Sequence, residues 1–285
     1  MSVYNLIPSV WTARLLANLH TAHVFGQAGV VNRDYEGDIR QKGDSVRINA
    51  IGAITIEDYI RDDQLGEPET LEDAQTVLEI DQAKYFHFQI DDVDRLQSSP
   101  DAMDEAMKEA AYALADSADR YIAGLYTDAA EGNTIGSTTT PKTDLGTAGR
   151  AYEYLVDLDT MLTEANVPRP GRWVVVPPWY YALLRKDERF IRSGTALGDQ
   201  ALRNGQIGMA AGLSVMESNN APNPAGSVYK IIAGYGGAIT FAEQIVQFEA
   251  YRPEKRFADA VKGLHLYGAK LVRPMGIAVL SAQRA

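Results

Sequence analysis

Apolar residues recur at helical spacing over one long stretch near the middle of the chain. The stripe runs through Met103, Met107, Ala110, Leu114, Ala118, Tyr121 and Leu125. Ser99 is suited to cap the start of a helix, Pro100 fits its first turn, and Asp101 suits the positive end of its dipole. The pattern predicts a helix over 99–129 that is about 45 Å long. A rod of this length is typical of a flat, plate-like subunit.

Three further helices are predicted from the same spacing. One runs from Trp179 to Phe190, and another from Val10 to Phe25 with Ser9 as its N-cap. The third spans 145–165 and precedes two prolines. Its apolar stripe consists of Leu145, Ala148, Tyr152, Leu155, Leu158 and Leu162, and the prolines are Pro168 and Pro170.

Residues 34–90 have the pattern of an extended arm. Two strand-like segments flank a polar tip that has too few apolar residues for a core of its own. The returning segment alternates strictly, as expected for a half-buried strand. Its two faces are Phe86, Phe88 and Ile90 against Tyr85, His87 and Gln89. Such an arm needs another surface on which to lie.

The remaining strands are short and do not alternate with helices. Residues 172–176 form a buried strand, and the others are predicted at 228–233, 244–250, 271–272 and 277–280. No internal repeat is present. The fold class is therefore α+β, with one extended arm and no βαβ series.

Composition narrows the class of protein. The chain has 285 residues, of which 46% are hydrophobic, enough for one large domain or two smaller ones. It has no cysteine, which excludes disulfides and thiolate chemistry. The longest apolar run, 173–184, contains Pro177 and Pro178 and is shorter than the roughly 20 residues of a membrane span. The amino terminus lacks the pattern of a signal peptide. We expect a soluble protein inside a cell, with no membrane partner.

The charge is unevenly distributed. Residues 34–81 carry −10 of the chain's formal net charge of −11. Residues 250–285 carry +5, and residues 169–192 carry +4. A single basic cluster is more often a solvent-exposed face than a binding surface. An acidic arm combined with basic regions in one chain, however, favours association between copies of the chain. The acidic pI of about 4.9 argues against a protein that grips nucleic acid through its phosphates.

The sequence contains no strong match to a catalytic or cofactor-binding motif. Gly234, Gly236 and Gly237 resemble part of a dinucleotide fingerprint, but Ile239 occupies its third glycine position. Too few residues follow for a nucleotide domain, so a tight turn between strands is the preferred interpretation.

The sequence also contains no residue spacing that is typical of a metal site. The four histidines, His20, His23, His87 and His265, form no HExxH or paired-carboxylate arrangement. His20 and His23 share a face of the predicted helix, where packing is the preferred interpretation over metal binding. Asp91, Asp92 and Asp94 lack the glycine and distal glutamate of a calcium loop. We therefore expect no cofactor, no metal site and no enzymatic activity.

Several short motifs, in this order and spacing, resemble a tailed-bacteriophage major capsid protein of the Hong Kong 97 fold. In the first half they are Trp11, Arg33-Asp34-Tyr35-Glu36-Gly37-Asp38, Gly43-Asp44-Ser45-Val46, Asp58-Tyr59, Asp81-Gln82, Lys84-Tyr85-Phe86 and Asp91-Asp92-Val93-Asp94. In the second half they are Gly205-Gln206-Ile207-Gly208, Gly212, Leu264-His265-Leu266-Tyr267-Gly268-Ala269-Lys270 and Arg273-Pro274. The resemblance spans nearly the whole chain.

The resemblance implies a domain assignment. It consists of an N-terminal arm at 1–33, an extended E-loop at 34–90, a peripheral domain at 91–169 with the spine helix, an axial domain at 170–255, and strands at 256–285 that return to the peripheral domain. It also implies hexamers and pentamers that enclose double-stranded DNA, which is contacted loosely. The implied partners are a portal protein and a possible decoration protein, and the implied location is the virion capsid, assembled in the host bacterial cytoplasm.

Two departures from the family refine these expectations. The motif at Gly43 lies too early to leave room for a fused scaffold, so a separate scaffolding protein is expected. Some relatives join subunits through an E-loop lysine and an asparagine in a neighbour. This chain has no lysine between Lys42 and Lys84 and no asparagine after Asn223, so we expect non-covalent contacts alone.

The acidic arm is expected to dock on basic surface of an adjacent subunit. The acidic candidates are Asp62, Asp63, Glu67, Glu69, Glu72 and Asp73. The basic candidates are Arg252, Lys255, Arg256, Lys262 and Arg273. Two alternatives remain open: an encapsulin-type shell that holds a protein cargo, and a nucleotide-dependent enzyme built on the glycines at 234–237.

Overall fold

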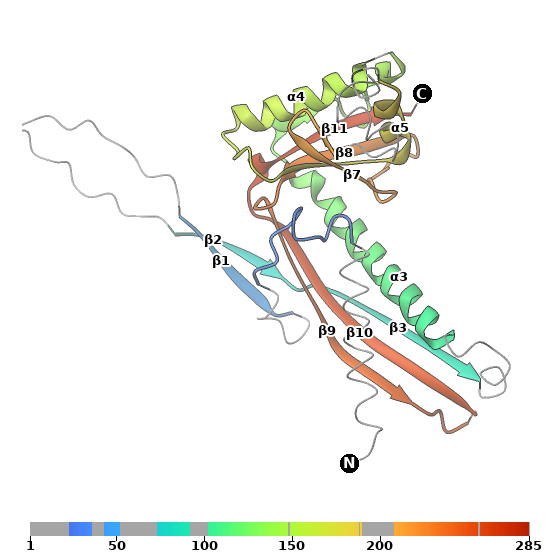
Figure 1. Ribbon diagram of the computed structural model, residues 1–285. Helices are drawn as coiled ribbons and strands as arrows, with labels where there is room; N and C mark the ends of the chain where they lie inside the picture. The colour runs from blue at the N-terminus through green and yellow to red at the C-terminus, as the bar shows by residue number, and fades with distance from the viewer. Residues whose placement is uncertain are drawn as a thin grey trace, which may run out of the picture.

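The computed structural model shows two neighbouring parts, each built on its own β-sheet, with a β-hairpin that projects to one side (Figure 1). The structure describes residues 23–35, 43–51, 73–91, 102–147, 149–187, 189, 208–255 and 257–284.

The first part is a mixed six-stranded sheet. Its strands, in spatial order, are β4 (Thr134–Ile135), β11 (Ile277–Gln283), β8 (Val228–Tyr235), β5 (Arg172–Val176), β7 (Leu213–Glu217) and β6 (Met209–Ala210). The pairs β5–β7 and β4–β11 are parallel, and the other pairs are antiparallel. In the register, Val174 of β5 pairs with Val215 on one side and Ala233 on the other.

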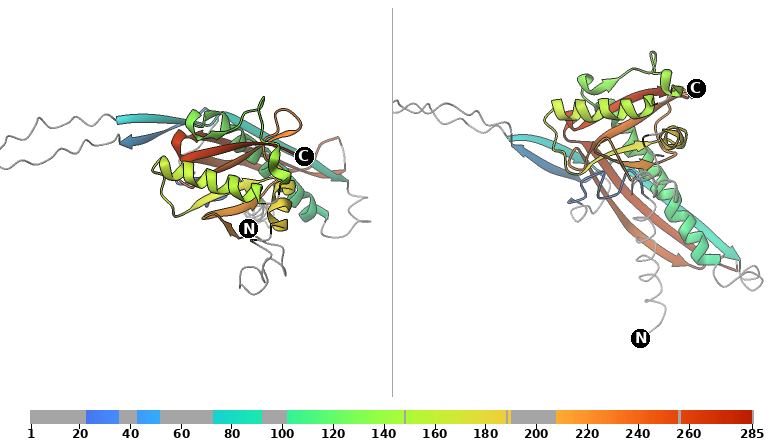
Figure 2. Two further views of the ribbon diagram at one scale, coloured as in Figure 1. Left: turned by 90° about the horizontal axis from the view of Figure 1, so that it is seen from above. Right: turned by 45° about the horizontal axis from the view of Figure 1, so that its top comes forward.

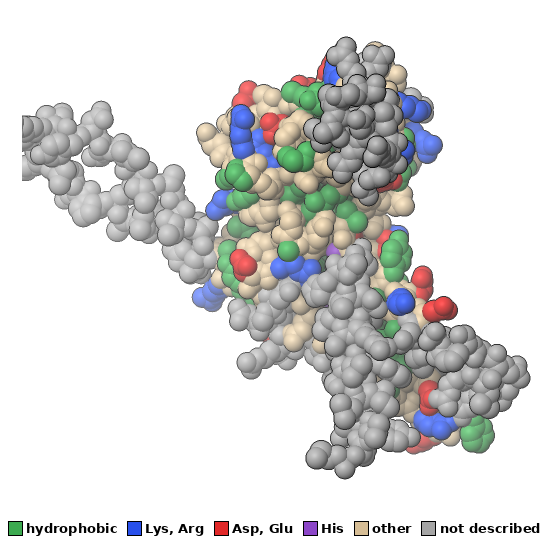
Figure 3. All heavy atoms as spheres, viewed as in Figure 1, with side chains coloured by type: hydrophobic (Ala, Val, Ile, Leu, Met, Phe, Trp, Pro, Cys, Tyr) green, Lys and Arg blue, Asp and Glu red, His purple; other side chains and the backbone are tan. Residues whose placement is uncertain are grey.

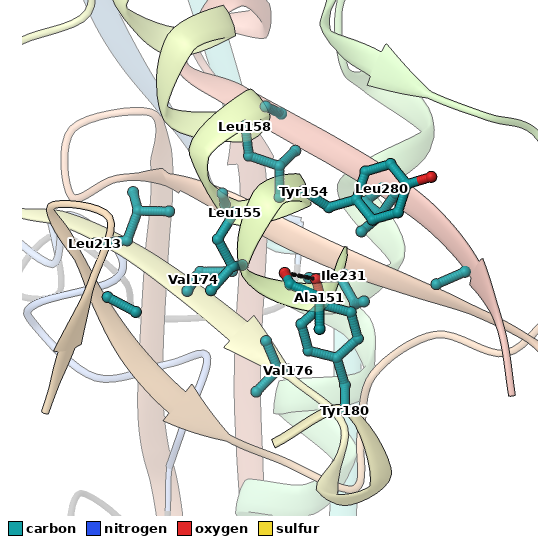
Figure 4. Close-up of a cluster of buried hydrophobic side chains, with 14 of the residues drawn as sticks. Ala151, Tyr154, Leu155, Leu158, Val174, Val176, Tyr180, Leu213, Ile231 and Leu280 are labelled. Atoms are coloured by element: carbon teal, nitrogen blue, oxygen red, sulfur yellow. Dashed lines mark hydrogen bonds between the residues drawn. The ribbon is translucent and has the colours of Figure 1, made fainter. Parts of the chain in front are cut away.

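Two helices cover one face of this sheet (Figure 4). They are α4 (Arg150–Glu164) and α5 (Pro178–Lys186). Leu155 and Leu158 of α4 are fully buried in the same cluster as Val174, as the apolar spacing of this segment predicts. Tyr180 of α5 is also fully buried, and its hydroxyl donates to the carbonyl oxygen of Ala151 at 2.7 Å.

The short strand β5 is buried at every position because both of its faces are covered. Val174 and Val176 face the cluster under α4 and α5. Trp173 and Val175 face a second cluster, which also contains Phe241. This second cluster lies at the junction of the two parts and joins them into one body.

The second part is elongated. Its antiparallel sheet has the order β3 (Gln82–Asp91), β10 (Ala258–Leu271) and β9 (Ile239–Tyr251). The longest helix, α3 (Ala102–Gly124), lies along this sheet (Figure 1). Phe86 and Phe88 of β3 pack against Met107 and Ala111 of α3, so the face predicted to be buried is the one that the helix covers.

The projecting hairpin consists of β1 (Ser45–Ile51) and β2 (Asp73–Glu79), with Val46 opposite Leu78. Its base is anchored by apolar contacts of Leu78 and Ile80 with Ala242 and Leu266 of the second part. The hairpin projects from the body in both further views (Figure 2). Residues 52–72, which connect its strands, lie outside the described residues.

The three helices predicted at 99–129, 145–165 and 179–190 are present, with differences at their ends. The α-helix of α3 ends at Gly124, and Leu125–Asp128 continue as a 3₁₀ helix. Helix α4 begins only at Arg150, because Gly149 has a left-handed φ of 83° that separates it from a 3₁₀ turn at Asp144–Gly146. Residues 99–101 and 190 lie outside the described residues.

The helix predicted from Val10 to Phe25 lies mostly outside the described residues, which begin at His23. Its predicted end is wrong, because residues 24–27 form bends, not helical turns. The backbone N–H groups of Val24, Phe25 and Gly26 donate to the carboxylate of Asp119 instead of to helix carbonyls.

The bounds of the strand predicted at 271–272 are also wrong. The strand found there, β10, spans fourteen residues and ends at Leu271. Its burial does not alternate, since its two faces are covered by different elements. Leu266 touches the base of the hairpin, whereas Tyr267 lies in the junction cluster. Without alternation, the period-two pattern of a strand is not visible in the sequence.

The predicted domain boundaries do not coincide with the division into two sheets. The β9 strand lies in the elongated sheet although it falls within the range predicted for the axial domain. Helix α4 packs on the six-stranded sheet although it falls within the range predicted for the peripheral domain. Strand β3 pairs with β10 in the body, so among the described residues of the predicted E-loop it is the β1–β2 hairpin that projects from the body. The functional domain names remain a prediction.

Candidate assembly surfaces and a buried charged network

The basic candidates for subunit contact lie in two separate places. Arg252 and Lys255 lie at the turn between β9 and β10, and Lys262 is nearby on β10. Arg273 follows the opposite end of β10. A strand of fourteen residues at about 3.4 Å per residue separates these places by more than about 40 Å. The described candidates therefore do not form one basic patch.

The basic residues near the turn already have acidic neighbours within the chain. The Nζ of Lys262 lies 2.7 Å from Oε2 of Glu249, and this contact raises the pKa of the Lys262 amine. The Nε of Arg252 lies 3.7 Å from Oδ1 of Asp259. The side chains of Arg252, Lys262 and Glu249 are more than half exposed and that of Asp259 is 32% exposed, and water weakens ion pairs of this kind. They can exchange these partners for those of another subunit.

Arg273 has a different environment. Its NH1 donates to the hydroxyl of Tyr235 at 2.6 Å, and its guanidinium lies 6.0 Å from the centre of the Tyr235 ring. An arginine that lies over an aromatic ring keeps its charge and its outward donors. The side chain is exposed, so it remains accessible to an acidic partner.

The acidic candidates Asp62, Asp63, Glu67, Glu69 and Glu72 lie outside the described residues, as does the basic candidate Arg256. The remaining acidic candidate, Asp73, is the first residue of β2. The pairing of the arm with a neighbouring subunit thus remains a prediction.

The elongated part carries exposed apolar side chains that the charge pattern did not point to. Phe257, in the β9–β10 turn, is 83% exposed, and Tyr85 on β3 is 78% exposed. Tyr112 on α3 is 58% exposed. The alternation of β3 places Tyr85 on the outer face, but nothing in the sequence distinguishes Phe257. Large exposed apolar side chains are typical of surfaces that meet other proteins.

Figure 3 shows positive and negative side chains scattered over the described surface in that view, without one dominant patch. This is consistent with contacts spread over several elements instead of one charged site.

A buried network of charged side chains lies where α3, β9 and β10 meet the segment at 23–33. Its centre is Glu243 on β9, which is 6% exposed. The Oε2 atom of Glu243 lies 3.2 Å from Nε2 of His23 and 3.0 Å from Nε2 of His265. Its Oε1 atom accepts a hydrogen bond from NH2 of Arg33.

Asp119 on α3 is the second carboxylate of this network. Its Oδ1 lies 2.8 Å from Nδ1 of His23 and accepts from the N–H of Gly26 at 3.0 Å. Its Oδ2 accepts from the N–H of Val24 at 2.7 Å and of Phe25 at 3.2 Å. The carboxylate thus satisfies three backbone donors that are left without helix partners.

Burial and hydrogen bonding act in opposite directions on this network. Burial lowers the pKa of His23, but its contacts with Asp119 and Glu243 outweigh burial and raise the pKa from 6.5 to about 9. Burial raises the pKa of Glu243, but His23 and His265 outweigh it and hold the pKa well below its usual range. At neutral pH, His23 is therefore protonated and Glu243 is ionised.

In the sequence, His23 has the pattern of an ordinary packing residue, so the buried charged network is not predicted. A weak signal was present, since Glu243 interrupts the apolar stretch of β9 and Asp119 follows the buried Ala118 on α3. A charge in an apolar run indicates a buried partner, but it does not identify that partner.

The structure favours neither metal nor nucleotide binding in the part of the chain it describes. No group of three or more histidine, aspartate or glutamate residues there is arranged to hold a metal ion. At the glycine turn after β8, a Cβ atom on Gly237 would lie 2.6 Å from the hydroxyl of Tyr235, so the turn is filled by the chain's own aromatic ring. This is the tight turn between strands that the sequence predicts.

No helix among the described residues is long and apolar enough to cross a membrane.

Comparison with known proteins agrees with the fold. A family model described as phage capsid protein matches residues 74–280. A search of curated proteins returns no match. A solved structure from Mycobacterium phage Che8 is 32% identical, with 90% of each chain covered and a TM-score of 0.72.

More distant structures share the fold. The capsid of the cyanophage P-SCSP1u is 17% identical, covers 92% of this chain and 89% of its own, and has a TM-score of 0.69. The holo-SrpI encapsulin complex from Synechococcus elongatus PCC 7942 is 12% identical, covers 86% of this chain and 84% of its own, and has a TM-score of 0.53.

The family match extends from β2 to β11 and includes all three α-helices that the described residues form. Together with the Che8 structure, it shows that the mixed helix and sheet fold of this chain is that of phage capsid proteins. The chain belongs to the phage capsid protein family, as a major capsid protein of the Hong Kong 97-like fold and a subunit of an icosahedral capsid.

Proposed function

We propose that copies of this chain assemble as hexamers and pentamers into a shell that encloses double-stranded phage DNA. The observation that carries the proposal is the β1–β2 hairpin, which projects from the body (Figure 1) and whose described apolar contacts with the body, including those of Leu78 and Ile80, lie at its base. A hairpin of two strands is marginally stable alone in water. Such an extension gains stability when it lies on another subunit, and a closed shell gives every copy a neighbour.

The acidic tip of this hairpin is proposed to dock on the basic residues near the β9–β10 turn of an adjacent subunit. Three observations support this pairing: the charge of −10 over residues 34–81, the exposure of Lys255, and the exposed, exchangeable pairs of Arg252 and Lys262. Arg273 lies too far from the turn to share the same contact and is proposed to meet a different part of the arm.

Charge reversal tests this docking. We expect Lys255→Glu to lower the yield of assembled shells at low salt, because it places two negative surfaces together. The matched control is Lys186→Glu, which alters an exposed lysine at the end of α5 on the six-stranded part. Shell yield is measured by sedimentation between about 50 mM and about 500 mM salt, a range over which exposed charges become screened. Wild-type shells that form equally well across this range, or equal yields for both variants, would refute the electrostatic role.

Contact with DNA is proposed to be loose, with the genome confined by the wall. The net charge of −11 and the scattered basic residues support this. The proposed partners during assembly are a separate scaffolding protein, a portal protein and possible decoration proteins, in the cytoplasm of the bacterial host. Tight binding of isolated subunits to DNA that falls steeply with salt would overturn the proposal of loose contact.

The second candidate is an encapsulin-type shell that holds a protein cargo. This alternative is supported by the encapsulin complex, whose fold matches 86% of this chain. The family match and the 32% identity to the Che8 structure favour the phage shell. Mass spectrometry of purified particles distinguishes the two, because an encapsulin would contain a guest protein and no genome.

A further inference from the structure

Residues 23–33 form a strap, a segment of bends and one turn at 28–30 that crosses the junction between the two sheets. Its apolar side chains, Phe25, Val30 and Val31, are at most 1% exposed and lie in the junction cluster. Near its end, the N–H of Asn32 donates to the carbonyl oxygen of Ile239 at 2.8 Å. The apolar side chains of the strap therefore belong to the core of the subunit.

One carboxylate holds both ends of the strap. Glu243 accepts from His23 at the beginning of the strap and from Arg33 at its end. Arg33 also donates through NH1 to the carbonyl oxygen of Gly26 at 2.8 Å, which closes the strap into a loop. On the opposite side, Nε2 of His265 donates to Glu243 at 3.0 Å and fixes the position of the carboxylate.

Asp119 extends the attachment to the spine helix. It contacts the His23 imidazole at 2.8 Å and accepts the N–H groups of the next three residues. The helix α3, the strand β9 and the strap are thus joined through His23, which lies between the two carboxylates.

Each charge in this network depends on the others, because an unpaired charge in the interior carries a large desolvation cost. Among the described residues, the charged or titratable groups that contact Glu243 include His23 and Arg33 from the strap and His265 from β10, and Asp119 contacts His23 from α3. The ring of Tyr267 lies 5.0 Å from that of His265. Lys84, the register partner of His265 on β3, is exposed to solvent.

His265 is a further hydrogen-bond partner of Glu243. Its Nε2 lies 3.0 Å from the carboxylate, and its buried Nδ1 has no hydrogen-bond partner among the described residues. The other described charged groups of the network are His23 and Arg33, which contact Glu243, and Asp119, which contacts His23.

We propose that Glu243 is the centre of a latch that holds the strap to the body as one unit, closed while His23 is protonated and both carboxylates are ionised, and opened when one of these charges is removed. The latch makes the attachment of the strap dependent on charge, while both sheets keep their own cores. It does not rest on the shell geometry proposed above.

Hydrogen exchange of the full-length chain, followed by mass spectrometry, tests the latch. In Glu243→Gln we expect amide exchange over residues 23–33 to accelerate about tenfold or more, while exchange over α4 stays unchanged. The matched control is Glu249→Gln, which removes an exposed carboxylate from the same strand. Unchanged exchange over the strap overturns the proposal, and so does an equal acceleration over the strap and α4.

A second measurement tests whether the latch acts as a unit. Arg33→Gln is expected to accelerate exchange over the strap in the wild-type background and to add little in the Glu243→Gln background. Additive effects would show independent contacts and overturn the latch.

The wild-type chain provides a test that needs no variant. After correction for intrinsic exchange, the strap is expected to lose protection selectively as the pH rises from about 7.5 to about 10, because His23 loses its proton in that range. Protection that stays constant relative to α4 would overturn the role of the protonated imidazole.

Discussion

Arg172 begins β5 with its side chain buried beneath the end of α4. Its NH1 donates to Oδ1 of Asp159 at 2.5 Å and to the hydroxyl of Thr163 at 2.8 Å. Its other nitrogens donate to the carbonyl oxygens of Val167 at 2.5 Å and Pro168 at 3.1 Å. The last carbonyl groups of a helix and the residues after it have no backbone partner. The planar fork of one guanidinium replaces those partners and allows the charge to be buried.

This arrangement predicts that lysine cannot replace Arg172. A single ammonium group reaches fewer of these acceptors, and the carbonyl oxygens that lose their donor remain buried. We expect Arg172→Lys to lower the free energy of unfolding by about 2–4 kcal/mol in urea titrations. Arg169→Lys, at an exposed position three residues earlier, should change it by less than about 0.5 kcal/mol. Equal effects of the two variants would contradict the proposed role of the guanidinium.

The raised pKa of His23 predicts how stability depends on pH. The imidazole has a pKa of about 9 in the folded chain and 6.5 as its ordinary value. Its contribution is therefore fully present below pH 6.5 and is lost as the pH rises through about 9. The difference corresponds to about 3 kcal/mol. We expect the free energy of unfolding to fall between these pH values in the wild type.

The matched variants separate this effect from other titrations. His23→Gln should be less stable at neutral pH and should lose the part of the slope that comes from the imidazole. His87→Gln, which alters an exposed histidine, should keep the wild-type slope. Parallel slopes in wild type and His23→Gln, measured by urea unfolding at each pH, would count against the network as the cause.

The strand β10 contacts two strands of its own sheet, the hairpin strand β2 and the helix α3. It is the central strand between β3 and β9, and the base of the hairpin crosses it at Gly268. A Cβ atom at Gly268 would overlap the carbonyl oxygen of Glu79 and lie 3.0 Å from Cδ1 of Ile80. Glycine is therefore required for the hairpin to approach the sheet closely.

Gly268→Ala is expected to displace the hairpin base and to lower the free energy of unfolding by about 1–3 kcal/mol, because backbone cannot yield as a flexible side chain can. The control is Gly132→Ala, since a Cβ atom there meets nothing within 4 Å. Urea unfolding monitors both variants. If Gly268→Ala left the free energy of unfolding unchanged, the hairpin base would be able to shift without loss of stability, and the requirement for glycine would be contradicted.

The elements differ in how well the sequence predicts them. The stripes of α3 and α4 and the alternation of β3 are visible because each element has one buried face and one exposed face. The strand β10 loses this signal because Leu266 and Tyr267 are buried on opposite faces. The network around Glu243 joins residues up to 220 positions apart, such as His23 and Glu243. Short-range spacing carries no information about such a contact.

For the whole molecule, the distribution of charge follows the division of the fold. The hairpin and its connecting residues carry most of the negative charge, whereas the basic candidates lie on the body. The body is held together by the junction cluster, into which β5, β9, β10, α3 and the strap all contribute. A rigid body with a charged extension is suited to repeated contacts between identical copies.

The composition of the whole chain predicts that the shell contains no covalent link between subunits. The chain has no cysteine, no lysine between Lys42 and Lys84, and no asparagine after Asn223, so neither a disulfide nor the lysine–asparagine link of some relatives can form. Purified shells that are boiled in detergent should migrate as a single band near 31.2 kDa. The shells should also dissociate in denaturant into free chains, with sedimentation as the measurement. A ladder of oligomers that survives boiling would contradict this prediction and would require a different pair of linked residues, which mass spectrometry of the cross-linked peptides would identify.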